Sequence, residues 1–303
     1  CSSDLSRKSK MKRVVYSGIE GRSLGYWGLM GVLGLFILMA AGSFFFMEHS
    51  GHHATGMDNQ IVWGIPHVFA IFLIVAASGA LNVASISSVF NQKIYKPLAR
   101  MSAILALTLL AGGLAVLVLD LGRADRLVVA MTSYNFKSIF AWNIYLYTGF
   151  FVIVLTYLWT MFDPAMHKYT RTAGTAAFLW RLALTTGTGS IFGFLSARQG
   201  YDAAVMAPMF IIMSFAFGKA IFMILLIGTY RYTERSMSAD LIMRLKNLFG
   251  VFVAAVLYFT VVFHITNLYA AEHSGFERFI LIEGGIFTML FWGVQVFLGG
   301  IVP

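Results

Sequence analysis

Long apolar segments constrain the fold of this 303-residue chain more than any other feature. A helix rises about 1.5 Å per residue, so roughly 20 apolar residues cross the hydrocarbon core of a bilayer. The ten-residue alternation of a membrane β-barrel is not found in the sequence. Segments long enough to span occur at 25–47, 63–90, 98–121, 137–162, 173–197, 204–230, 245–271 and 279–300. The sequence therefore predicts an all-α integral membrane protein, a bundle of about eight transmembrane helices.

The composition supports this class and limits the redox chemistry of the chain. Hydrophobic residues make up 59% and charged residues 12%, and the mean hydropathy of +0.78 is far above that of a soluble domain. The single cysteine, Cys1, excludes an internal disulfide, an iron–sulfur cluster held by this chain alone and covalent haem attachment. We therefore expect any metal-centred electron carrier to lie in a partner subunit.

The distribution of Lys and Arg between the expected loops predicts the orientation. With residues 1–10 left out, twelve lie on the side of the N-terminus and five on the other side. The twelve are Lys12, Arg13, Arg22, Lys93, Lys96, Arg100, Lys168, Arg171, Arg231, Arg235, Arg244 and Lys246, and the five are Arg123, Arg126, Lys137, Arg198 and Arg278. Cytoplasmic loops carry the excess of positive charge, so we expect a cytoplasmic N-terminus. The net charge of +9 then reflects topology and does not indicate nucleic-acid binding.

The stretch 119–143 carries an unusual group of polar and aromatic side chains between two apolar segments. Asp120 and Arg123 are three residues apart, so a helical end would place both on one face. Tyr134 and Trp142 follow within the same stretch. Two interpretations stay open here: a helix end held by its own ion pair, and a functional surface at the membrane boundary.

Three stretches resemble the NrfD/PsrC family, the polysulfide reductase membrane subunits. They are LDLGR-x-x-R followed by S-x-x-x-W at 138–142, WGIPHVFAIFLIVAASGALNVASI at 63–86 and SARQGYDAAVMAPMF at 196–210. The resemblance is closest to the DsrP type, the quinone-interacting subunit of the membrane complex that accompanies dissimilatory sulfite reductase. It covers 11–303 as a single NrfD-like domain and implies a helical bundle, in one arrangement two four-helix bundles.

The resemblance also implies a function. Family members exchange electrons between quinones and an attached iron–sulfur protein, so it implies a menaquinone-type quinone as bound substrate. It implies a ferredoxin-like iron–sulfur subunit on the periplasmic side, further redox subunits, and sulfur metabolism at the bacterial inner membrane. Asp120 and Arg123 are implied to lie beside the quinone pocket. The chain stops at Pro303 after an apolar run where longer relatives continue, so we expect a truncated C-terminus.

This sequence departs from one branch of the family in its histidines. Some family members, those related to alternative complex III, have a histidine within the second helix and another within the fifth. At these places this chain reads AASGA (76–80) and TTGTGS (185–190). We therefore choose His67 and His264, by their depth in the apolar segments, as the histidines that would exchange protons in place of the two missing ones. Histidine suits proton exchange near neutral pH, and a buried Asp or Glu with a raised pKa can serve as well.

A quinone site needs an apolar slot, hydrogen-bonding groups for the ring oxygens and a group that exchanges protons. We expect such groups near the outer face. The candidate catalytic residues are Asp120, His264 and Glu283, and the candidate binding residues are Asp120, Arg123, Tyr134, Trp142, His67 and Asn267. Glu283 is included because a carboxylate among apolar residues needs a partner or a proton. The histidines of the EHSGHH loop at 48–53 are expected to be solvated, so no metal site is predicted.

A second polar layer is expected nearer the cytoplasm, at Asn82, Arg181 and Lys219. For Asn82 we favour a residue that holds helices together by hydrogen bonds. For the two cations, a functional role and side chains that reach to the membrane surface are both open.

Two alternatives to a quinone-interacting subunit come from other classes of protein. A secondary transporter or proton-conducting subunit without redox activity predicts internal inverted repeats, of which the sequence shows no clear case. A di-haem cytochrome b needs paired histidines on facing helices, and only His67 and His264 lie in apolar segments.

The first ten residues differ from the rest. The run CSSDL can arise by translation of the end of a sequencing adapter, so residues 1–10 are interpreted as a non-native leader before Met11. The alternative is a lipidated mature N-terminal cysteine, for which no preceding signal sequence is seen.

The charge distribution gives a testable topology. We expect a cysteine introduced as Ala124→Cys to react with a membrane-impermeant maleimide in intact cells, because the loop that follows Arg123 faces outward. A cysteine placed in the 168–171 loop is the control and should react only after lysis. Labelling of Ala124→Cys only after lysis would reverse the orientation.

Overall fold

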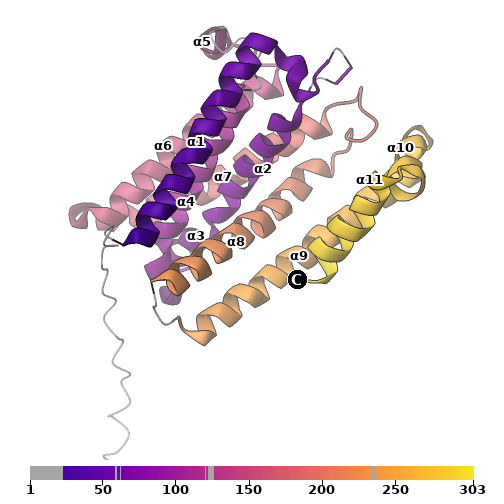
Figure 1. The fold of residues 1–303 in the computed structure, drawn as a ribbon. Coiled ribbons are helices and arrows are strands. Elements are labelled where there is room, and N and C mark those ends of the chain that lie inside the picture. The colour runs from indigo at the N-terminus through magenta and orange to yellow at the C-terminus, as the bar shows by residue number, and fades with distance from the viewer. Residues whose placement is uncertain (1–22, 59, 62, 120, 122–125, 234–236) are drawn as a thin grey trace, which may run out of the picture. The chain divides into compact units, whose positions relative to one another are not determined.

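Helices make up all the regular secondary structure in the described part of the chain, as predicted (Figure 1). The computed structural model describes residues 23–303 except 59, 62, 120, 122–125 and 234–236. The expected leader at 1–10 and the motif residues Asp120 and Arg123 lie outside the described residues. The chain divides into two units, Cys1–Ala54 and Thr55–Pro303.

The first unit contains one long helix, α1 (Leu24–Ser50). Its start is capped by Ser23, whose hydroxyl accepts a hydrogen bond from the Tyr26 amide at 3.1 Å. Its end falls at Gly51, which has a φ of 85°, a conformation that glycine adopts without steric cost. A short 3-10 helix, η1 (His52–Thr55), follows.

The second unit contains the remaining helices. The α-helices up to residue 269 are, in chain order, α2 (Ile65–Ala80), α3 (Asn82–Ser88), α4 (Ala99–Leu119), α5 (Leu127–Thr132), α6 (Ile139–Phe162), α7 (Thr170–Gly193), α8 (Met206–Tyr232) and α9 (Ala239–Tyr269). The C-terminal segments are η5 (Ala271–His273), α10 (Ser274–Arg278), η6 (Phe279–Glu283), α11 (Ile286–Met289) and η7 (Leu290–Ile301), and two short 3-10 helices, η2 (Lys93–Leu98) and η4 (Pro164–Tyr169), precede α4 and α7.

All eight expected segments are helical, but they do not all qualify as membrane spans. Six helices among the described residues are long and apolar enough, and a seventh results if the bent pair Ala271–Glu283 and Ile286–Ile301 counts as one span. The helix that does not qualify is α7, which is rich in Thr and Gly and carries Arg181 in its middle. The bundle class is thus confirmed, with six or seven such spans instead of eight.

The helices of the second unit form one group around α2. Within the apolar window of α2 and α3, 72% of the residues are buried, and α2 contacts α4, α7 and α8. One main core takes side chains from α2, α3, α4, α6, α7, α8 and α9. The helix α9 packs on α8, and the C-terminal segments pack on α9 (Figure 1).

The closest contact in this group is the crossing of α2 and α8. A Cβ atom at Gly79 would lie 1.6 Å from the carbonyl oxygen of Ser214, and one at Gly218 would lie 2.1 Å from the amide nitrogen of Ala80. Only glycine permits such an approach of two backbones, which is how small residues bring membrane helices together. The two glycines therefore set the distance between α2 and α8.

Side-chain hydroxyls satisfy the backbone where helices break. At the break between α2 and α3, Ser102 Oγ donates to the Ala80 carbonyl at 2.6 Å and accepts from the Ala84 amide at 3.0 Å. At the bend of 75° after η6, Thr288 Oγ1 accepts from the Gly284 amide at 3.0 Å and donates to the Phe279 carbonyl at 3.1 Å. Both breaks occur in apolar surroundings. Burying one backbone group there without a hydrogen bond costs about 2 to 7 kcal/mol.

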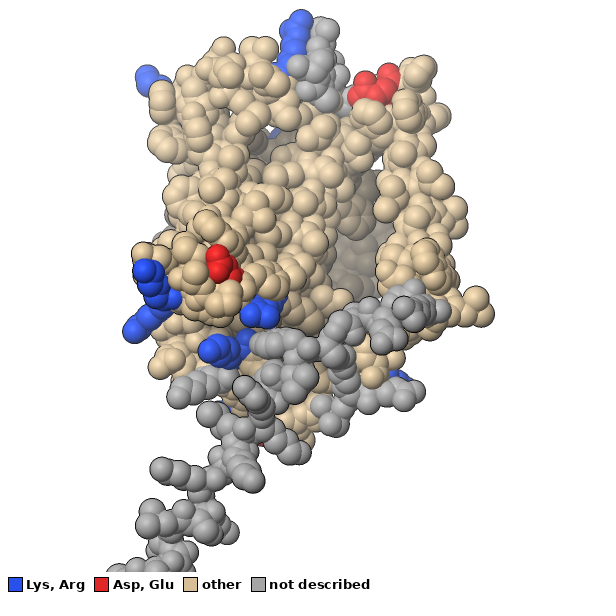
Figure 2. Space-filling model, turned by 90° about the vertical axis from the view of Figure 1, so that its left-hand side faces the viewer, with Lys and Arg blue, Asp and Glu red and all other residues tan. Residues whose placement is uncertain are grey.

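The surface agrees with a membrane protein. In Figure 2, Lys, Arg, Asp and Glu gather toward the two ends of the visible face, and the surface between them carries none. Many large apolar side chains are exposed, for example Leu155 and Trp159 on α6 and Val251 and Tyr258 on α9. An uncharged band of this kind is expected where helices face lipid.

The α2–α8 crossing can be tested with two substitutions in one helix. We expect Gly218→Leu to lower the thermal unfolding midpoint of the detergent-purified protein, because the side chain would overlap the backbone of α2 and overpacking costs about 1–3 kcal/mol or more. Gly228→Leu on the same helix is the control, since no atom lies within 4 Å of its Cβ position. Equal midpoints for both variants would contradict the assigned contact.

Candidate functional site

The site centres on a buried carboxylate, Glu277 on α10, whose side chain is 0% exposed. Its Oε2 lies 2.6 Å from His264 Nδ1, and its Oε1 accepts a hydrogen bond from Asn267 Nδ2 at 2.9 Å. A charge is retained in an apolar interior only when hydrogen bonds and an opposite charge replace its water. We call His264, Asn267 and Glu277 the buried polar cluster.

Local structure explains how the three residues meet. His264 and Asn267 are three apart on α9, so they share a face of that helix. The chain turns after Tyr269 and returns through η5 and α10, which brings Glu277 against the same face. The turn is attached to the loop before α8 by His273 Nδ1, 2.8 Å from the carbonyl oxygen of Gln199.

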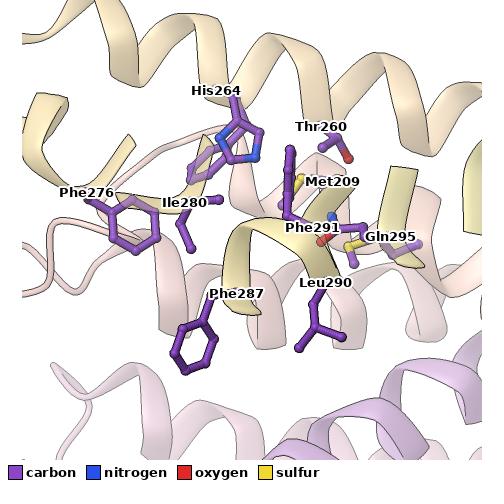
Figure 3. A pocket seen from close by; sticks show the side chains of 11 residues that line it. Met209, Thr260, His264, Phe276, Ile280, Phe287, Leu290, Phe291 and Gln295 are labelled. Atoms are coloured by element: carbon purple, nitrogen blue, oxygen red, sulfur yellow. The ribbon is translucent and has the colours of Figure 1, made fainter. Parts of the chain in front are cut away.

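The buried polar cluster borders a cavity of about 330 Å³ (Figure 3). His264, Thr260 and Gln295 are the polar groups in its wall. The remaining wall is apolar and aromatic: Met209, Met213, Phe263, Phe276, Ile280, Phe287, Leu290 and Phe291. An apolar slot with a few polar groups is typical of sites for small organic molecules.

The imidazole of His264 connects the cluster with the cavity. Its ring meets Phe291 edge to face, with centroids 4.8 Å apart and planes at 76°. Figure 3 shows the ring projecting from α9 toward Ile280 and Phe291, on the same helix as Thr260. Nδ1 of this ring faces Glu277, so Nε2 is the ring nitrogen on the edge away from that carboxylate.

The structure corrects the expected burial of the acidic residues. The sequence pattern predicts Glu283 among apolar residues, but its side chain is 53% exposed and lies 2.6 Å from Arg278 Nε. The same pattern leaves Glu277 in an outer loop, yet Glu277 is the fully buried carboxylate. The reason is that helical structure begins at Ser274, several residues before the expected start of the last segment at 279. One face of this extra turn lies against α9.

Tyr134 and Trp142 form a separate aromatic group. The Tyr134 hydroxyl donates to the Ala141 carbonyl, and Trp142 Nε1 donates to the Phe136 carbonyl at 2.9 Å. The ring of Tyr134 lies 4.4 Å from that of Tyr145. Partial desolvation, with a smaller effect of Tyr145, raises the pKa of Tyr134, so its hydroxyl stays a neutral donor. The hydroxyl of Tyr134 and the indole nitrogen of Trp142 thus both donate to backbone carbonyls of this same segment.

His67 belongs to an aromatic group that borders the cavity wall. Its ring stacks on Trp63 with centroids 4.9 Å apart and planes at 1°. Trp63 meets Phe192 at 5.3 Å, and both pack in one hydrophobic cluster with Phe263, which lines the cavity. Of the expected outer residues, the structure thus groups His264 with Asn267, and it places Trp63, on which His67 stacks, in the hydrophobic cluster of Phe263.

The inner cations are buried and do not reach the membrane surface. Arg181 is 0% exposed and Lys219 is 1% exposed. Arg181 Nη1 donates to the Ser78 carbonyl at 3.1 Å, and its guanidinium lies 4.5 Å from the ring centroid of Phe215. Among the described residues, Arg181 Nε and Nη2, Lys219 Nζ and Asn82 Nδ2 have no hydrogen-bond partner. Snorkelling is therefore excluded for both cations.

These features define a multi-pass helical membrane protein with a buried acid–imidazole pair beside an aromatic cavity. The family model described as polysulphide reductase, NrfD, matches residues 53–303, and the chain belongs to this family. The expected resemblance is thereby confirmed at the level of the family.

Three curated relatives cover most of the chain. The integral membrane subunit of the Hdr-like menaquinol oxidoreductase of Archaeoglobus fulgidus is 29% identical over 94% of this chain and 71% of its own length. A putative dimethyl sulfoxide reductase membrane subunit of Halobacterium salinarum is 25% identical over 91% of the chain and 68% of its own length. A selenate reductase subunit of Mesobacillus selenatarsenatis is 21% identical over 92% and 72%. All three names describe subunits of redox enzymes.

The geometry of the histidines leads to a spectroscopic prediction. We expect the purified chain to show no Soret band that shifts on reduction. A haem held by two histidines needs both imidazoles free to ligate iron, whereas His264 faces Glu277 and His67 lies flat on Trp63. The check is a reduced-minus-oxidised visible spectrum of the chain separated from its partners. A haem signal that stays with the chain would contradict it.

Proposed function

We propose that this chain is the quinone-interacting membrane subunit of a respiratory oxidoreductase complex, with a menaquinone-type quinone as its substrate. The observation that carries the proposal is the aromatic cavity with His264 in its wall. The family supports it, because one relative is named as a subunit of a menaquinol oxidoreductase.

The cavity has the properties that a quinone head group requires. At about 330 Å³ it is near the lower end of the usual range of about 300–1,000 Å³ for small-molecule sites. That size suits a bicyclic ring, while a polyprenyl tail would extend past the wall into lipid. Phe276, Phe287 and Phe291 supply faces and edges for the ring. His264 Nε2 would then bond one ring oxygen.

The outer motif completes the proposal. Asp120 and Arg123 would bind or protonate the second ring oxygen, as the family resemblance implies, and Tyr134, Trp142 and His67 would shape the entrance from that side. Glu283, which is exposed, would exchange protons with the outer surface and would not act as the buried acid.

The assembly and location follow from the same reasoning. We assign the N-terminus to the cytoplasm and the His264 end of α9 to the periplasmic side of a bacterial inner membrane. A ferredoxin-like iron–sulfur subunit docked on that side, together with further redox subunits, would exchange electrons with the quinone, and the sulfur metabolism of DsrP-type complexes is the proposed pathway class.

Quinol turnover by the assembled complex tests the proposal. We expect His264→Ala and Asp120→Asn each to lower menadiol oxidation about 100-fold, the usual loss when an acid or base is removed. The matched control is Ile265→Ala, the next residue on α9, which is 60% exposed and is not among the residues that line the cavity.

Assembly is measured in parallel by co-purification of the partner subunits. If His264→Ala and Asp120→Asn both retain control turnover in a fully assembled complex, the quinone binds elsewhere. The inner layer around Arg181 and Lys219 would then be the next region to test.

A further inference from the structure

The role of Glu277 goes beyond the proposed function, although it rests on it. We propose that Glu277 is a positioning residue that holds His264 in the tautomer able to accept a proton from the bound quinol. It contacts His264 directly and acts through that ring, which in turn lines the cavity.

Hydrogen-bond chemistry fixes the tautomer. An ionised carboxylate accepts hydrogen bonds and donates none, so the Nδ1 of His264, 2.6 Å from Oε2, carries the ring proton. In a neutral imidazole the other nitrogen then has a lone pair, and Nε2 lies on the edge opposite Glu277. Asn267 holds the carboxylate in its orientation, because its Nδ2 donates to Oε1 at 2.9 Å.

The proposed step is a proton transfer alone. The O–H bond of the quinol breaks and an N–H bond forms at Nε2, which leaves a quinolate in the cavity and an imidazolium at His264. No electron moves in this step. The quinolate is oxidised afterwards by a one-electron carrier of the iron–sulfur class in the partner subunit. The carboxylate of Glu277 stabilises the imidazolium in surroundings of low dielectric.

The remaining charged groups near this part of α9 have other partners or point elsewhere. In η5, His273 contacts the Gln199 carbonyl, and Glu272 is 77% exposed. Arg278 pairs with Glu283 on the exposed side. The described parts of α8 and η7 contribute only uncharged side chains to the cavity wall. Among the described residues, Glu277 is thus the charged group that faces His264.

A structural ion pair is the competing interpretation, and it predicts a different outcome. If Glu277 only held α10 against α9, its neutral isostere would affect stability without changing the proton chemistry of the cavity. A positioning role requires that turnover and its pH dependence change while the head group still binds.

The experiment compares Glu277→Gln, Glu277→Asp and Glu272→Gln in the intact complex. Menadiol oxidation reports turnover, and quenching of 2-heptyl-4-hydroxyquinoline N-oxide fluorescence reports binding of a head-group analogue. Glu272→Gln is the control, because it removes a carboxylate five residues away that is 77% exposed.

We expect Glu277→Gln to lower turnover about 10- to 100-fold with analogue affinity within about 3-fold of wild type. Turnover rises as the imidazolium loses its proton, and without the carboxylate the imidazolium is less stable. The pH of half-maximal turnover should therefore fall. Glu277→Asp keeps the charge, so it should restore much of the rate, and Glu272→Gln should match wild type.

Wild-type turnover and an unchanged pH midpoint in assembled Glu277→Gln would overturn the role of Glu277, while loss of turnover in His264→Ala would leave the proposed site intact. If His264→Ala is also fully active, the proposed site itself fails. Should Glu277→Gln not assemble, Glu277→Asp decides alone, because its shorter side chain weakens the contact with His264: a partial loss of turnover with analogue affinity within about 3-fold of wild type supports the role, and fully wild-type turnover overturns it.

Discussion

The structure depends on one constraint: in an apolar medium each backbone N–H and C=O group must find its hydrogen bond within the chain. Continuous helices meet this requirement along most of the described residues. Where they break, at Leu81 and at Gly284, the hydroxyls of Ser102 and Thr288 bond the backbone groups that flank the break. The breaks are therefore built features of the fold, and the second one shapes the segment that closes the cavity.

Helices in a membrane associate through close packing, because an apolar side chain is as well accommodated by lipid as by another helix. The contact of Gly79 and Gly218 brings α2 and α8 into backbone contact and places α2 at the centre of the group. The position of α8 in turn determines where α9 packs. The cavity beside His264 takes Met209 from α8 and Thr260 from α9, so it lies where these two packed helices meet the C-terminal segments.

Buried charge is handled in two different ways in this protein. Near the end of α9, Glu277 has two side-chain partners, and its neighbourhood includes a cavity. On α7 and α8, Arg181 and Lys219 are buried with several nitrogen atoms that lack partners among the described residues. The functional proposals are placed at Glu277 and His264 because a hydrogen-bonded acid–imidazole pair beside a cavity is typical of functional sites.

The sequence alone determined the class, because the length and apolarity of the segments admit few other folds, and it named His264, chosen by its depth in an apolar segment, and Asn267 among the candidates. It did not determine which carboxylate is buried. Glu277 and Glu283 are six residues apart around the start of the last apolar segment, and only the helix start at Ser274 and the packing on α9 turn Glu277 inward. Burial is decided by which face meets a neighbour, and hydropathy along a chain does not contain that information.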